Sequence, residues 1–251
     1  MEDYVIFTDS SCDLPAELAK ELGLVVLPLS FHLNGKEYSN LLDGREMPFG
    51  EFYRHIRAGE PCTTAAVNVD AFVNAMEPVL QSGKNVLAVA MSSGLSNTYN
   101  AAKMACDELA EKYPERKLFA VDTLAASLGE GMLVALAAQK KREGSSMEEV
   151  RDWLERNKLH LCHWFTVDDL NHLKRGGRVS GATALIGTML NIKPVLHVDD
   201  EGHLIPMEKV RGRKKSLTAL LNHMEKTGTQ PLADQMVFIT LNSFAKCSRS
   251  S

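Results

Sequence analysis

The sequence has little that would support a metal site, a disulfide framework or a membrane anchor. Its five cysteines are scattered without a C-x-x-C pair, and no histidine stands at zinc-ligand spacing from any of them. This pattern is typical of free thiols in a reducing compartment. The chain also lacks the basic start and long apolar stretch of a signal peptide, and no segment approaches the roughly 18 apolar residues of a membrane helix. We therefore expect a cytoplasmic protein with no metal ion and no integral membrane association.

Charge and glycine patterns argue against further classes of protein. The net charge of −4 gives no general attraction to nucleic acid, so no nucleic-acid partner is expected. The chain has no G-x-x-x-x-G-K-[ST] loop for a nucleotide and no G-x-G-x-x-G after its first apolar run, which argues against a dinucleotide-binding protein. No serine lies in a G-x-S-x-G motif. We expect no cofactor.

What the sequence does contain is an ordinary globular composition, with 45% hydrophobic and 24% charged residues among 251. In the first half, short apolar runs alternate with amphipathic helices, which indicates βα units on a largely parallel sheet. The expected strands cover residues 5–8, 24–33, 85–91 and 117–121. The expected helices are one capped by Asp13, one after a turn at Asn34-Gly35 with Phe49, Phe52, Tyr53 and Ile56 on one face, and three at 69–82, 96–112 and 126–143.

The second half of the chain has a different pattern. Ser145 and Ser146 each stand three residues before a glutamate, which is capping-box spacing and indicates a new helix. The expected elements after it are a strand at 161–167, helices at 168–174 and 181–191, a hairpin of 194–198 and 203–210, a helix at 214–226 and a strand at 236–240. We therefore predict an α/β protein with a Rossmann-like parallel-sheet domain over residues 1–158 and a smaller α/β domain with a mixed sheet over 159–251.

Polar residues follow two of the expected strands, at the edge where open α/β sheets bind ligands. They are Thr8-Asp9-Ser10-Ser11 after the first strand and Ser92-Ser93 after the strand at 85–91, with Thr63-Thr64 in a third expected loop. Helix N-termini at this edge would present free N–H groups and a positive dipole end, which suit an anion. Each motif alone is also explained as a helix N-cap, so spacing by itself does not settle a site.

An ordered set of motifs is the most specific feature of the sequence. In chain order it comprises Thr8-Asp9-Ser10, Thr63-Thr64, the segment 92–99 (SSGLSNTY), Asp122-Thr123, the segment 168–181 (DDLNHLKRGGRVSG) and the segment 190–194 (LNIKP). Together these motifs resemble those of the DegV family of two-domain fatty-acid-binding proteins. The Leu-Lys-Arg-Gly-Gly-Arg block is the most specific of them.

The resemblance implies a non-catalytic protein that holds a long-chain fatty acid between its two domains and presents the carboxylate to a separate fatty acid kinase in lipid metabolism. The implied carboxylate ligands are the hydroxyls of Thr63 or Thr64 and of Ser92 or Ser93. The residues implied around them or at the tunnel mouth are Asp9, Ser10, Asn97, Arg175 and Arg178. Two positions depart from the family pattern, because Ala65-Ala66 replaces Gln-Pro and Asn97 replaces Gly.

Some features leave alternatives open. One strongly basic neighbourhood is either a solvated face or, as the resemblance implies, a surface that docks a kinase or stabilises an acyl phosphate. It comprises Arg175, Arg178, Lys193 and the basic cluster of Lys209, Arg211, Arg213, Lys214 and Lys215. The ending after Thr240 does not match the Gly-rich, histidine-bearing ending of the family, through truncation, a shifted frame or divergence. The alternative function is a small-molecule hydrolase or phosphotransferase that uses Asp9 with Ser92 or Ser93.

Overall fold

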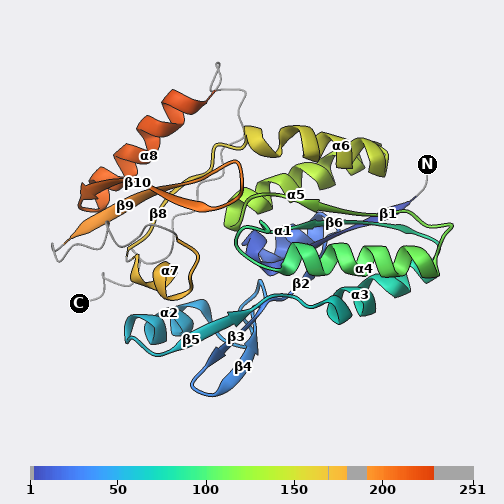
Figure 1. The fold of residues 1–251 in the computed structure, drawn as a ribbon, viewed down its shortest axis with the longest axis horizontal. Coiled ribbons are helices and arrows are strands. Elements are labelled where there is room, and N and C mark those ends of the chain that lie inside the picture. The colour runs from blue at the N-terminus through green and yellow to red at the C-terminus, as the bar shows by residue number, and fades with distance from the viewer. Residues whose placement is uncertain (1–2, 169, 180–190, 229–251) are drawn as a thin grey trace.

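A parallel four-stranded sheet with helices on both faces forms the first half of the computed structural model, which describes residues 3–168, 170–179 and 191–228 (Figure 1). The strand order is β2-β1-β6-β7. The strands are β1 (Tyr4–Asp9), β2 (Val25–Leu27), β6 (Asn85–Ala90) and β7 (Leu118–Asp122). One face is covered by α1 (Ala16–Glu21), α5 (Ser127–Arg142) and α6 (Met147–Asn157), and the other by α3 (Val69–Gln81) and α4 (Thr98–Lys112).

The central strand β6 is buried along its whole length, because helices cover both of its faces. Leu87 and Val89 point into the core under α5 and α6, whereas Val86 and Ala88 point into the core under α3 and α4. This alternation explains the continuous apolar run of the sequence. Since β1, β6 and β7 are parallel neighbours, their carboxyl ends reach the same edge of the sheet.

A second, antiparallel sheet was not expected from the sequence. It has the order β4-β3-β5 and consists of β3 (Ser30–Leu33), β4 (Lys36–Ser39) and β5 (Cys62–Ala65). The single strand predicted at 24–33 is wrong, because the chain leaves β2 at Pro28 and enters a different sheet at Ser30. Proline has no N–H to donate to a ladder, which explains the break. The turn at Asn34-Gly35 is confirmed, with φ of 54° and 77°, but it joins β3 to β4. The expected helix follows later as α2 (Phe49–Arg57).

One of the two predicted helix caps is correct. Ser146 caps α6 through a capping box, in which its hydroxyl accepts the Glu149 N–H and the Glu149 carboxylate accepts the Ser146 N–H. The cap predicted at Asp13 is wrong. Asp13 ends the short 3₁₀ turn η1 (Ser10–Cys12) at φ 51°, and Pro15 precedes the first residue of α1 without a side-chain cap. The Asp13 carboxylate instead accepts the Ser127 hydroxyl at 2.6 Å, at the start of α5.

The second half of the chain forms a three-stranded sheet of order β10-β9-β8, with α8 packed on it (Figure 1). After the short turn η2 (Lys158–His160), its elements are β8 (Trp164–Thr166), α7 (Asn171–Arg175), β9 (Ile192–Val198), β10 (Leu204–Arg211) and α8 (Arg213–Thr227). Both strand pairings are antiparallel, and a single bridge from Val179 to Leu204 is parallel. The predicted hairpin is confirmed. Apart from Asn191, the helix expected at 181–191 lies outside the described residues, as does the strand expected at 236–240.

The predicted α/β class, with a Rossmann-like first half and a smaller α/β second half, is confirmed by these sheets. The sheet of the second half, expected to be mixed, is antiparallel over its described strands. The boundary expected between residues 158 and 159 falls at the start of η2 and stays a prediction. In the part of the chain that the structure describes, no helix combines the length and the apolarity needed to cross a membrane.

Candidate functional site

Asp9 ends β1 and connects two of the loops at the carboxyl edge of the sheet. Its side chain is fully buried and accepts backbone N–H groups from Ser11 and Met91, each at 3.0 Å. Burial raises the pKa of Asp9, while the hydrogen bonds from Ser11 and Met91 oppose that rise. Because Met91 immediately precedes Ser92-Ser93, Asp9 positions the candidate loop instead of pointing toward solvent.

Ser10 connects the parallel sheet to the segment between the two sheets. Its hydroxyl oxygen accepts the Leu29 N–H at 3.0 Å and the Asn40 side-chain amide at 3.2 Å. The residue is buried. Its position therefore fixes where the chain turns from β2 into the small antiparallel sheet.

The two adjacent serines of the candidate loop have opposite environments. Ser92 is buried, and its hydroxyl donates to the Gly202 carbonyl at 2.8 Å and accepts the Gly94 N–H at 3.1 Å. Ser93 is exposed, and its hydroxyl has no hydrogen-bond partner among the described residues. Of the two, Ser93 is the hydroxyl available to a ligand. An enzymatic nucleophile needs an adjacent base, and the described part of the chain places none in hydrogen-bond contact with Ser93 Oγ.

The free backbone N–H groups expected at the start of α4 are largely occupied. The Ser93 N–H lies 3.2 and 3.3 Å from the Asp122 carboxylate oxygens, and the Thr98 N–H donates to Ser96 Oγ at 3.2 Å. Asn97 is the N-cap residue but makes no side-chain cap; its side-chain oxygen accepts the Asn100 amide instead. The N–H groups of Ser93 and Thr98 are therefore not free to bind an anion, and an anion site at this helix start stays a prediction.

Thr63 and Thr64 lie on β5, so the loop predicted for them is wrong. They stand opposite His32 and Phe31 of β3 in the antiparallel ladder. Both are exposed, and neither hydroxyl is hydrogen-bonded to a described residue. No hydrogen bond between described atoms joins this pair to Ser92 or Ser93.

The candidate loop lies where the two halves of the protein meet. Leu95 packs against the apolar core of the C-terminal sheet, which consists of Leu170, Val179, Leu196, Val198 and Leu204. The turn between β9 and β10 sits directly on the loop, so that a Cβ on Gly94 would lie 3.0 Å from the Glu201 carbonyl oxygen. Arg178 reaches the same loop, because its Nε donates to the Leu95 carbonyl at 3.3 Å. Arg175 is exposed.

A second contact between the halves involves His163 and α5. A Cβ on Gly129 would lie 2.5 Å from His163 Nδ1, so the imidazole packs directly on the helix backbone. Burial, and to a lesser degree the charge of His197, lowers the pKa of His163 to about 4. Next to this contact is a hollow of about 190 Å³, bounded by Leu124 of the first half and by Leu159, Leu161, Trp164 and Val198 of the second.

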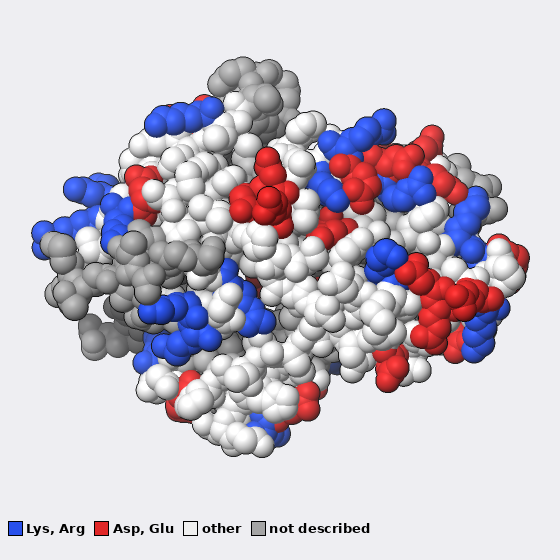
Figure 2. All heavy atoms as spheres, in the orientation of Figure 1, with Lys and Arg blue, Asp and Glu red and all other residues white. Residues whose placement is uncertain are grey.

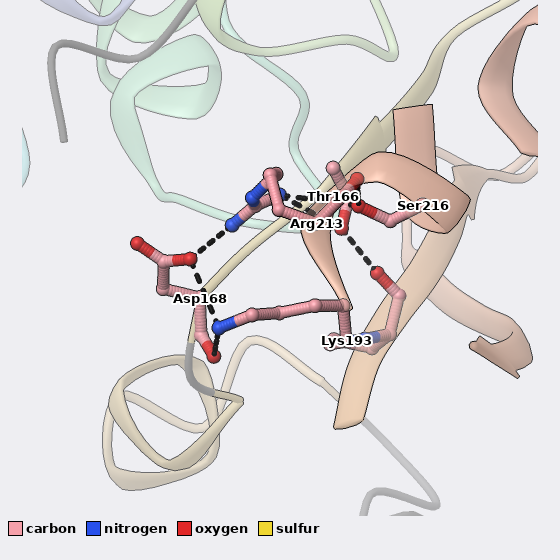
Figure 3. A network of polar contacts seen from close by, with 6 residues as sticks. Thr166, Asp168, Lys193, Arg213 and Ser216 are labelled. Carbon is pink, nitrogen blue, oxygen red and sulfur yellow. Dashed lines mark hydrogen bonds and ion pairs between the residues drawn. The ribbon is translucent and has the colours of Figure 1, made fainter. Parts of the chain in front are cut away.

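The Arg213 and Lys193 side chains converge on Asp168 at the end of β8 (Figure 3). Lys193 Nζ lies 3.1 Å from Asp168 Oδ1, and Arg213 also reaches Thr166 and Ser216. Partial burial would raise the pKa of Asp168, but the hydrogen bonds from Arg213 and Lys193 outweigh it and hold that pKa below its ordinary value. These two cations are therefore already paired within the protein.

The remaining basic residues of this region are exposed. They are Lys209 and Arg211 of β10 and Lys214 and Lys215 of α8. Figure 2 shows that Lys and Arg predominate over the half of the visible face that carries β9, β10 and α8, whereas both signs alternate over the parallel-sheet half. The predicted basic cluster is thus a surface feature.

Fold and loops together define a two-domain α/β protein with a candidate ligand site at the junction of a Rossmann-like sheet and an antiparallel sheet. The chain belongs to the DegV family: the family model described as "Uncharacterised protein, DegV family" matches residues 3–249. A DegV domain-containing protein of Clostridium perfringens is 46% identical over 239 residues, which are 95% of this chain and 81% of the relative. One from Streptococcus pyogenes serotype M3 is 36% identical over 240 residues, or 96% and 82%.

Solved structures agree with this family assignment. A DegV family protein from Thermus thermophilus, described for its fatty acid binding, superposes with a TM-score of 0.77 at 36% identity, covering 90% of this chain and 78% of that one. DegV from Bacillus subtilis, described as a fatty acid binding protein, gives a TM-score of 0.75 at 29% identity, with the same coverages.

Proposed function

We propose that this protein binds a long-chain fatty acid between its two domains, without catalysing a reaction, and presents the carboxylate to a separate fatty acid kinase. One observation carries the proposal: the exposed hydroxyl of Ser93, which bonds to none of the described residues, lies on a loop that the C-terminal domain covers. Relatives of similar fold in T. thermophilus and B. subtilis are fatty acid binding proteins, which supports the same class of ligand here. In this proposal, the two domains of the protein are residues 1–158 and residues 159–251.

In this proposal, Ser93 is the first contact of the carboxylate, and the exposed hydroxyls of Thr63 or Thr64 are further contacts. Ser92 instead holds the β9–β10 turn through Gly202. Asp9, Ser10 and Asn97 shape the loops around the head group. Arg178, bound to the Leu95 carbonyl, brings positive charge to the same loop. The Asp122 carboxylate beneath the Ser93 N–H disfavours a second anion there, so the ligand carboxylate approaches from the hydroxyl side.

The affinity of such a site lies in the acyl chain. Burial of about a dozen methylenes at about 0.8 kcal/mol each supplies on the order of 10 kcal/mol before association costs are subtracted. A hydroxyl hydrogen bond to a carboxylate contributes about 1.5–3 kcal/mol. The chain therefore sets affinity and the head group sets orientation. Orientation matters for a kinase, because phosphoryl transfer requires the attacking oxygen to be in line.

The exposed basic surface of β10 and α8 supports a partner in this scheme. Lys209, Arg211, Lys214 and Lys215 would attract an acidic surface of the kinase or the phosphate of the product, and this attraction would weaken as salt increases.

We expect the purified protein to contain about one equivalent of fatty acid from its expression host. Burial of the acyl chain supplies roughly 10 kcal/mol before association costs are subtracted, and such a site seldom stays empty. Organic extraction followed by mass spectrometry measures this directly. Recovery of a nucleotide or sugar phosphate in place of a fatty acid would overturn the proposed ligand class.

Ser93→Ala should weaken binding of a fatty acid by about 1.5–3 kcal/mol, or roughly 10- to 100-fold, while binding of its methyl ester changes little. The ester keeps the chain but carries no charge, so the comparison isolates the head group. Ser82→Ala is the matched control, because among the described residues the Ser82 hydroxyl bonds to the Val79 carbonyl of α3 alone. Equal losses for acid and ester would show that Ser93 does not hold the carboxylate.

A further inference from the structure

Glu130 is a buried acid that contacts the candidate site only indirectly. It lies in the first turn of α5 and is fully buried. Its Oε1 accepts the Thr8 hydroxyl at 3.1 Å, and its Oε2 lies 2.6 Å from Ser11 Oγ. The same Ser11 oxygen lies 2.5 Å from Asp9 Oδ1. Ser11 Oγ therefore stands between two buried carboxyl groups, at hydrogen-bond distance from both.

Counting hydrogens at Ser11 fixes the protonation of this group. A serine hydroxyl carries one hydrogen, so it can donate to only one of the two carboxyls. The second short contact requires a hydrogen on the other carboxyl. Asp9 accepts two backbone N–H groups, which favour its charged form, so Ser11 donates to Asp9. The additional hydrogen then lies on Glu130 Oε2 and is donated to Ser11 Oγ.

The surroundings of the pair also disfavour a second negative charge. Neither Asp9 nor Glu130 forms a salt bridge with a described residue. Among the described residues, the other ionisable groups that act on the pair are Cys12 and Asp13 of the β1 loop, which are both acidic. Farther out, Tyr53 of α2 faces Asp13 and has the cation Arg57 beside it. Burial, followed by the charge of Asp9, raises the pKa of Glu130 well above its ordinary value.

We propose that Glu130 is held as a neutral carboxylic acid whose hydrogen bond to Ser11 keeps Asp9 in place, and that Glu130 thereby positions the 91–93 loop for ligand binding. If Glu130 loses its proton, its Oε2 and Asp9 Oδ1 repel each other across Ser11. Asp9 then withdraws from the Met91 N–H, and the loop that carries Ser93 loosens. Glu130 is a positioning residue, and the part of its role that concerns the ligand rests on the proposed function.

Two isosteric substitutions have opposite expected results. In Glu130→Gln the side-chain oxygen accepts from Thr8 and the amide donates to Ser11, which reproduces the neutral acid but cannot ionise. In Asp9→Asn the side-chain NH₂ group must face the backbone N–H of either Ser11 or Met91. Two hydrogen-bond donors then point at each other, with no acceptor between them. We expect the first variant to fold normally and the second to be the destabilised one in denaturant unfolding. The reverse order of stabilities would overturn the proton assignment.

The proton itself can be observed without any ligand. Carbon-13 NMR of protein labelled at the glutamate side-chain carboxyls, titrated from about pH 5 to about pH 10, separates glutamates by their titration. One resonance, absent from Glu130→Gln, should keep the chemical shift of a protonated acid at neutral pH. If every glutamate titrates near its ordinary pKa, the proposal is wrong, whatever the protein binds.

The positioning role predicts a pH dependence of binding. Palmitate is the probe, because its own carboxylate is already charged across the range used. Across the pH at which the NMR titration shows Glu130 losing its proton, the affinity of the original protein should fall by about tenfold or more, whereas Glu130→Gln should lack this fall. Identical pH profiles would overturn the positioning role. If palmitate does not bind at all, the proposed function fails together with the positioning role, while the NMR titration still decides the protonation.

Discussion

Gly202→Val should lower the free energy of unfolding by about 3–5 kcal/mol, since positive-φ strain, overpacking and a lost hydrogen bond add together. Gly202 has φ 79°, and a Cβ there would lie 2.0 Å from Ser92 Oγ and 3.1 Å from the Leu124 Cα. Ser92 cannot retreat without losing its bond to the Gly202 carbonyl. The turn would therefore lift off the candidate loop, and fatty acid binding should fall with stability.

Gly177→Val is the matched control for this variant. Gly177 has a similar φ of 71°, but a Cβ there would have nothing within 4 Å. Its substitution therefore adds only backbone strain, about 1–2 kcal/mol. Urea unfolding followed by circular dichroism measures both variants. Equal losses of unfolding free energy in the two variants would mean that the close contact between Gly202 and Ser92 contributes nothing to stability.

Gly131→Ala should also destabilise the protein, by about 3 kcal/mol, although alanine is ordinarily the better helix residue. Gly131 lies within α5, and a Cβ there would be 2.4 Å from the Cys12 carbonyl oxygen and 3.0 Å from Leu14 Cδ2. The Cys12 carbonyl is backbone, so relief requires α5 to move away from the β1 loop. That movement would also disturb Asp9 and Glu130.

Gly50→Ala gives the opposite expectation and serves as the control. Gly50 lies in α2, where a Cβ would meet nothing within 4 Å. The substitution should stabilise the protein by about 0.5 kcal/mol through the lower backbone entropy of the unfolded chain. Thermal unfolding of the Gly131→Ala and Gly50→Ala proteins shows directly whether each substitution stabilises or destabilises the fold. A stabilised Gly131→Ala protein would show that α5 can shift freely over the β1 loop.

The parts of the fold that the sequence predicts are those in which local pattern and burial agree. The strands at 85–91 and 117–121 are apolar because helices cover both sheet faces, and the Ser146 capping box is a local interaction. The small antiparallel sheet was missed. Two of its strands read Lys36-Glu37-Tyr38-Ser39 and Cys62-Thr63-Thr64-Ala65 and are largely exposed, so their pairing depends on neighbouring strands and not on their own composition.

The candidate site was predictable as a region but not as a set of contacts. The motif locates Ser92 and Ser93, but it does not show that Ser92 is buried and bonded to the distant Gly202 while Ser93 is exposed. The burial of Glu130 was not predicted, because a single acidic residue in an amphipathic helix is ordinarily interpreted as a surface residue. Its burial depends on Thr8 and Ser11, more than a hundred positions earlier in the chain. Long-range pairings of this kind leave no periodic signal in the sequence.

The two tryptophans give each half of the protein its own fluorescent reporter. Trp153, in α6, has the Lys140 ammonium over its ring. Trp164, in β8, stacks on His197 and on His223, with ring centroids 4.5 and 3.8 Å away. A chain that keeps only Trp164 therefore emits from the C-terminal sheet alone, and one that keeps only Trp153 emits from the helices over the parallel sheet. Emission from the two indoles can thus distinguish separate melting of the halves from their melting as one unit.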